Sequence, residues 1–151
     1  MALPPFQQLL DAHGRDVHRF LVAIVGRGEA DDCYQETWIA ALRAYPRLRS
    51  ASNLRAWVIT IAHRKALDHL RASKRRAEPV ADVAGGAAVD GLPEVWGLVR
   101  ELPPKQRTAV ALRFLADSPY AEIAAVMRTS EEAARRNVHE GLKRLRAEYV
   151  R

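Results

Sequence analysis

The sequence predicts an all-α protein in which two small helical domains are joined by a flexible linker. Apolar residues recur at the three- and four-residue spacing of amphipathic helices over most of the chain. No stretch of useful length shows the two-residue alternation that is typical of a strand. Residues 73–91 carry no apolar stripe and are rich in Ala, Gly, Val and Asp, a composition typical of a linker. We therefore expect one domain over residues 1–72 and the other over residues 92–151.

The composition restricts the class of protein. Hydrophobic residues make up 48% of the 151 residues, which is enough for packed cores. The formal net charge of +6 favours a polyanionic partner such as nucleic acid, although an ordinary basic globular protein has the same property. Cys33 is the only cysteine, so neither an internal disulfide nor a multi-cysteine zinc site can form.

The N-terminal segment gives no indication of secretion or membrane insertion. Charged residues interrupt the apolar pattern of residues 6–25, unlike the continuous apolar region of a signal peptide. No apolar run is long enough to span a bilayer. We expect a cytoplasmic protein that does not insert into a membrane.

Two amphipathic helices are expected at the start of the first domain. The first covers residues 6–24 and should be ended by Gly26 and Gly28. The second should begin at Asp31 and Asp32, because carboxylates favour the positive end of the helix dipole, and Pro46 should end it. Its apolar stripe, the expected core side, consists of Tyr34, Thr37, Trp38, Ala41, Leu42 and Tyr45.

A polar loop, residues 47–53, precedes a third helix that we expect over residues 54–71. Trp57 lies on its apolar stripe and is expected in the core. Asp68 is the only acid between positions 54 and 76, so this segment is strongly basic. Its cations are Arg55, Arg64, Lys65, Arg71, Lys74, Arg75 and Arg76. Such a face can follow the phosphates of nucleic acid, or it can simply be solvated.

Four helices are expected in the second domain, over residues 94–102, 105–115, 120–127 and 131–149. The last two have the layout of a helix-turn-helix, in which Thr129 or Ser130 can cap the second helix. One side of that helix is apolar and would hold it on its scaffold. The opposite side, which would enter a DNA major groove, carries Glu132, Arg135, Arg136, His139 and Lys143.

Segments in both domains resemble the sigma-70 family of RNA polymerase sigma factors, and in particular its extracytoplasmic-function group. Residues 29–38 read Glu-Ala-Asp-Asp-Cys-Tyr-Gln-Glu-Thr-Trp, an acidic pair followed by Gln-Glu-Thr and an aromatic residue, which resembles sigma region 2. Residues 54–62 and 66–71 resemble the next part of region 2. In the second domain, Leu102-Pro103, Arg107, Leu112-Arg113 and Tyr120-Ala121-Glu122-Ile123-Ala124 resemble region 4.

This resemblance implies a function in transcription initiation, without catalysis and without a cofactor. Region 2 would bind the clamp helices of the largest subunit of core RNA polymerase, and it would open the promoter and read its minus-ten element. Region 4 would bind the polymerase flap and read the minus-thirty-five element, while the linker would run between them. An anti-sigma factor is a further candidate partner.

The resemblance also assigns roles to individual residues. Asp32, Gln35 and Glu36 are expected to contact polymerase. The loop from Arg49 to Asn53 would hold a flipped promoter base, and the helix from Glu131 would read the upstream element. The full set expected to bind DNA is Asn53, Arg55, His63, Arg64, Lys65, Arg71, Glu132, Arg135, Arg136, His139 and Lys143.

Several positions depart from the usual family pattern. Met127-Arg128-Thr129 occupies a turn where the family has a small residue or Gly, and Glu132-Ala133-Ala134 replaces the common Gly-Thr-Val. Arg64 stands where region 2 often has Asn, and Asn137 where region 4 often has Arg. These departures affect the promoter sequence that would be read more than the fold.

Other classes of protein fit the sequence less well. A DNA-binding repressor or activator would explain the helix-turn-helix but not residues 31–38 and 57–71. An enzyme would need a site, and the sequence shows no phosphate-binding loop, no catalytic triad and no histidine spacing suited to a metal. Cys33 has no neighbouring base and reads as a helix residue.

Overall fold

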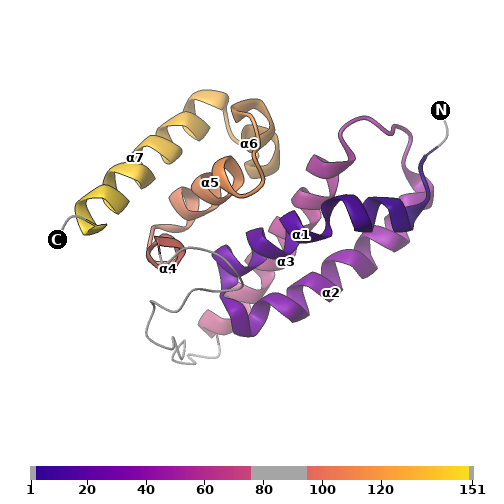
Figure 1. Ribbon diagram of the computed structural model, residues 1–151, viewed down its shortest axis with the longest axis horizontal. Coiled ribbons are helices and arrows are strands. Elements are labelled where there is room, and N and C mark those ends of the chain that lie inside the picture. The colour runs from indigo at the N-terminus through magenta and orange to yellow at the C-terminus, as the bar shows by residue number, and fades with distance from the viewer. Residues whose placement is uncertain (1–2, 76–94, 150–151) are drawn as a thin grey trace.

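The computed structural model describes residues 3–75 and 95–149, and every regular element within these two ranges is helical (Figure 1). The elements are α1 (Phe6–Val25), α2 (Arg27–Ala44), the short 3-10 helix η1 (Tyr45–Arg47), α3 (Leu54–Arg75), α4 (Val95–Val99), α5 (Pro104–Phe114), α6 (Tyr120–Met127) and α7 (Glu131–Tyr149). Helices α1 to α3 form one group and α4 to α7 form a second (Figure 1). The prediction of an all-α fold is confirmed.

A single residue separates the first two helices. Gly26 has a φ of 86°, a conformation that costs a residue with a side chain more than it costs glycine. Its N–H donates to the Val22 carbonyl, and its own carbonyl accepts from the Ala30 N–H. Helix α2 therefore begins at Arg27, four residues before the predicted start at Asp31, and Gly28 lies inside the helix. The prediction that Gly28 helps to end the first helix was wrong.

The predicted core side of α2 is confirmed at most positions, but not at its C-terminal end. Thr37, Trp38, Ala41 and Tyr45 are buried as expected. Leu42, which was also assigned to the core, is 55% exposed. It lies one helical step from Ala41, which turns it away from α1 and α3 and toward solvent.

Helix α3 is capped at its start and is longer than predicted. The Asn53 side-chain oxygen accepts the Ala56 N–H at 3.2 Å, which satisfies one of the free amides of the first turn. The helix continues to Arg75, so residues 73–75, assigned to the linker, are helical. The remainder of the predicted linker lies outside the described residues.

The helix-turn-helix has the predicted boundaries. Arg128 ends α6 in the left-handed conformation, with a φ of 55°, which costs a residue with a side chain more than it costs glycine. Ser130 accepts the Ala133 N–H through its Oγ at 3.0 Å, which confirms one of the two predicted caps. Helix α7 then lies very close to α5, because a Cβ on Gly141 would lie 2.7 Å from Val110 Cγ2.

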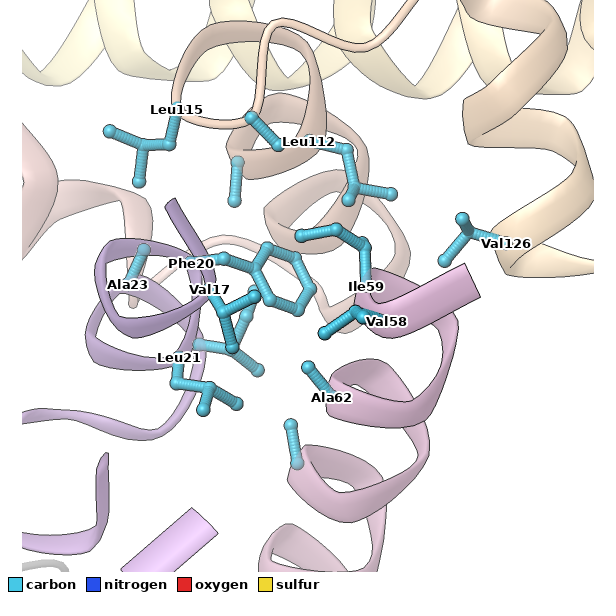
Figure 2. Close-up of a cluster of buried hydrophobic side chains, with 14 of the residues drawn as sticks. Val17, Phe20, Leu21, Ala23, Val58, Ile59, Ala62, Leu112, Leu115 and Val126 are labelled. Carbon is cyan, nitrogen blue, oxygen red and sulfur yellow. The ribbon is translucent and has the colours of Figure 1, made fainter. Parts of the chain in front are cut away.

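The two groups of helices share a hydrophobic core. Figure 2 shows Phe20 of α1 and Ile59 of α3 facing Leu112 of α5, with Val126 of α6 at the edge of the cluster. Phe20, Ile59 and Leu112 are at most 1% exposed. The two predicted domains therefore pack against each other and bury apolar surface between them.

Candidate partner and DNA-binding surfaces

The outer face of α2 combines polar and apolar side chains. Asp32, Gln35 and Glu36, predicted from the sequence to bind polymerase, are all exposed. Ile39 and Leu42 follow Gln35 at helical spacing and are 50% and 55% exposed. Large exposed aliphatic residues at adjacent positions are typical of a protein-binding surface. The sequence analysis missed this apolar part because it assigned Leu42 to the core and Ile39 to no role.

His69 of α3 contacts two glutamates of α2, at one edge of this outer face. Its Nε2 lies 2.5 Å from a carboxylate oxygen of Glu36, and its Nδ1 lies 3.0 Å from one of Glu29. Burial alone would lower the pKa of His69, but the hydrogen bonds to Glu36 and Glu29 outweigh it, so the pKa is raised. Glu36 is therefore held against α3, whereas Gln35 projects from α2 into solvent.

The basic residues predicted along α3 differ in accessibility. Arg64 and Arg71 are exposed, and Lys65 is half-buried. His63 is only 9% exposed, and its ring packs at 6.5 Å from the ring of Phe20. It also makes a hydrogen bond to the backbone of Val126 in α6. The expectation that His63 faces DNA or solvent does not hold in this arrangement, because α6 covers it.

Asn53 and Arg55, at the start of α3, also contact the other group of helices. The Asn53 amide donates to Glu122 Oε1 at 2.5 Å, and Arg55 Nη2 lies 3.5 Å from Glu122 Oε2. Arg55 Nη2 also donates to the Asp117 carbonyl at 3.3 Å. The Arg55 and Glu122 side chains are 25% and 18% exposed. Two predicted DNA-binding residues are thus occupied by a carboxylate from α6.

The outer face of α7 is exposed to solvent. All five residues predicted to contact DNA on this helix are exposed: Glu132, Arg135, Arg136, His139 and Lys143.

The two adjacent arginines of α7 have different surroundings. Arg135 donates to Glu131 at 3.1 Å, and its guanidinium lies 5.1 Å from the centre of the Tyr120 ring. Arg113 lies 4.9 Å from the same ring. The Arg136 side chain makes no ion pair or hydrogen bond with any residue that the structure describes. The geometry therefore restrains Arg135 and leaves Arg136 free to reach a ligand.

Three further features that could carry a function are a reactive thiol, a metal site and a membrane-spanning helix. Burial, aided by the nearby carboxylates of Glu36 and Glu29, raises the pKa of the Cys33 thiol to about 12, which disfavours the reactive thiolate. Among residues 3–75 and 95–149, no cluster of His, Cys, Asp and Glu has the geometry of a metal site. None of the described helices has the length and apolar character needed to cross a membrane.

Comparison with known proteins decides the family. Residues 9–76 match the family model of sigma-70 region 2, and residues 92–145 match that of sigma-70 region 4. A probable RNA polymerase sigma-C factor of Mycobacterium bovis is 32% identical over 80% of this chain and 70% of that protein. The sigma factor CarQ of Myxococcus xanthus is 30% identical over 93% of this chain and 87% of its own length.

The chain is an RNA polymerase sigma factor of the extracytoplasmic-function type. It thus belongs to the proteins that direct RNA polymerase to promoters, as the sequence resemblance implied. The ECF sigma factor SigX of Bacillus subtilis is 25% identical over 93% of this chain and 81% of that protein.

Solved sigma factor structures share the fold of this one. RpoE of Bartonella quintana, in complex with the anti-sigma factor NepR, superposes with a TM-score of 0.83 at 22% identity and covers 94% of each chain. CnrH, in complex with the cytosolic domain of CnrY, has a TM-score of 0.72 at 23% identity and covers 95% of this chain and 86% of that one.

Proposed function

We propose that this sigma factor binds core RNA polymerase through the outer face of α2. The supporting observation is the solvent-facing stripe of Gln35, Ile39 and Leu42, with Asp32 and Glu36 beside it. A few well-packed side chains at the centre of a protein interface carry most of its binding energy, and a polar rim surrounds them. The clamp helices of the largest polymerase subunit are the proposed partner.

We further propose that the remaining surfaces bind promoter DNA. The basic face of α3, with Arg64, Lys65 and Arg71, would follow the phosphates of the opened minus-ten region. The outer face of α7 would enter the major groove at the minus-thirty-five element. Arg136 would read a base and Arg135 would contact the backbone, because the contacts of Arg135 with Tyr120 and Glu131 limit its reach.

We also propose that the protein acts in the cytoplasm as a transcription regulator without catalytic activity. Its thiol is buried, and the described residues form no cluster suited to a metal. An anti-sigma factor is a proposed further partner. The support is the structure of RpoE, which shares the fold and was solved in complex with the anti-sigma factor NepR.

The polymerase contact can be tested by capture of purified core enzyme. We expect the double variant Gln35→Ala, Glu36→Ala to bind core polymerase more weakly. The double variant Ile39→Ala, Leu42→Ala should lose more binding free energy, about 1–3 kcal/mol, because it removes the apolar centre of the surface. Glu140→Ala, an exposed change on α7, is the control and should bind normally. Circular dichroism checks that helicity is intact. Unchanged capture by both α2 variants would show that polymerase binds elsewhere.

A further inference from the structure

The start of α3 contains a small anion-binding site that is already filled from within the chain. The Asn53 amide and the Arg55 guanidinium both point to the Glu122 carboxylate, which comes from α6, 69 residues away from Asn53 in the sequence. Asn53 has a left-handed φ of 53°, and both ends of its side-chain amide are engaged, because the oxygen caps α3 and the nitrogen donates to Glu122. The site is therefore preorganised for a negatively charged oxygen pair.

The surroundings of this site are held by further contacts between the two groups of helices. Arg55 also donates to the Asp117 carbonyl, and its charge helps burial to lower the pKa of His13 on α1, although Asp16 acts in the opposite direction. Arg107 of α5 donates to the Ile24 carbonyl at the end of α1, at 3.1 Å. These polar contacts join the two groups of helices, which also share the apolar cluster of Figure 2. We call this arrangement, in which Glu122 contacts both Asn53 and Arg55, the closed form.

We propose that Glu122 competes with a DNA backbone phosphate for the site formed by Asn53 and Arg55, so that these two residues can bind promoter DNA only after α6 moves away. A phosphodiester offers the same pair of anionic oxygens as a carboxylate. Both cannot occupy the site at once. This inference rests on the proposed DNA-binding role of region 2.

The burial of His63, which lies on the same helix as Arg55, supports the competition. His63 lies two helical turns along α3 from Arg55, is buried, and makes a hydrogen bond to the backbone of Val126, on the same α6 that carries Glu122. Movement of α6 would therefore uncover His63 and free Asn53 and Arg55 together. The α7 face is exposed in the closed form, so its availability does not depend on this movement.

The charge of Glu122 can be removed with little change of shape. We expect Glu122→Gln to shift the equilibrium between closed and open forms toward the open form by about 3- to 10-fold, as a partly exposed charged hydrogen bond contributes. The matched control is Glu140→Gln, which removes the same charge from an exposed site on α7. Raised salt should reduce the difference between the two variants, because it screens the charge of Glu122.

Opening can be measured by energy transfer between dyes on two introduced cysteines, Arg47→Cys and Ala125→Cys, both at exposed positions. Cys33 is buried and has a raised pKa, so it should not react in the folded chain. The second readout is the affinity of the full, unlabelled chain for a short single-stranded DNA of mixed sequence. Glu122→Gln should lower the energy transfer and raise the DNA affinity, whereas Glu140→Gln should leave the energy transfer unchanged.

The outcomes separate this inference from the proposed function. Equal energy transfer and equal DNA affinity in the two variants would overturn the competition, whatever the protein does with polymerase. Opening without a gain in DNA affinity would also overturn it, because the uncovered site would then not bind phosphate. Promoter opening by core polymerase that is insensitive to an Arg64→Ala, Lys65→Ala variant would instead count against region 2 as a DNA surface.

Discussion

The two candidate DNA-binding surfaces of this sigma factor are presented in opposite ways. On α7, the residues proposed to enter the major groove are all exposed. At the start of α3, Asn53 and Arg55 are engaged by Glu122, and His63 is covered by α6. Both surfaces are basic, so charge alone does not distinguish them. The difference comes from packing between the two groups of helices.

This comparison teaches that accessibility is a separate property from surface chemistry. The α7 face needs only its own helix and the scaffold beneath it. The α3 surface depends on where a second group of helices lies, and a modest free energy can therefore regulate it. The three predictions below test the comparison, from the largest expected effect to the smallest.

Removal of apolar contact between the two groups should have the largest effect. Leu112 is fully buried in the shared cluster, so Leu112→Ala should lower the free energy of unfolding by about 2–5 kcal/mol. Phe114, two residues later on the same helix, is 52% exposed, and Phe114→Ala should change it by about 0.5 kcal/mol or less. Urea denaturation followed by circular dichroism measures both. Similar losses in the two variants would show that the shared core is not a main source of stability.

The sequence was sufficient to predict elements whose signals are local. The boundaries of α6 and α7 follow from turn and cap residues such as Ser130, and both were predicted to the residue. The start of α2 was missed because the acidic pair Asp31 and Asp32 is a stronger local signal than the single Gly26 that divides the helices. A helix start can therefore be misplaced where a strong capping signal, such as Asp31 and Asp32, lies inside the helix.

The sequence was not sufficient where burial depends on distant segments. The buried state of His63 requires α6, and the engagement of Asn53 requires Glu122. Nothing within one helical turn of these residues indicates such partners. The exposure of Leu42 has the same origin, since none of the helices that the structure describes covers its side of α2. The roles of the predicted site residues in binding stay predictions.

Substitutions on the exposed face of α7 should have a smaller effect, and they should separate base recognition from phosphate binding. Arg136→Ala should weaken binding to the matched upstream element by about 1–3 kcal/mol and relax the preference at one base pair. Arg135→Ala should weaken matched and scrambled sites alike and lower the salt dependence of binding by about one phosphate contact. Fluorescence anisotropy on both duplexes at two salt concentrations separates these roles. A specificity change in the Arg135 variant alone would reverse the assignment.

The covered surface should respond weakly to pH, through His63. Burial lowers the pKa of His63, and the nearby charge of Arg64 lowers it further, while the hydrogen bond to the Val126 backbone partly opposes both. Once α6 moves away, the pKa should return toward its ordinary value of about 6.5. As the pH falls below this ordinary value, the open form binds more protons than the closed form, so acidification favours opening. The stabilisation of the closed form is therefore fully present only above the ordinary pKa. Because one histidine takes up at most one proton, the free energy of opening can change by no more than about 1.4 kcal/mol per pH unit.

Energy transfer between the dyes at positions 47 and 125, recorded from pH 7.5 to 5.5, should therefore decrease on acidification as the domains separate. The pKa of His69 is raised by Glu36 and Glu29, which lie with it in the first group of helices, so its titration should not follow the movement of α6. His63→Gln keeps a hydrogen-bond donor and removes the titration, and it should flatten the profile, with any residual slope assigned to His13. A full pH response in His63→Gln would show that protonation acts on the covered surface through another group.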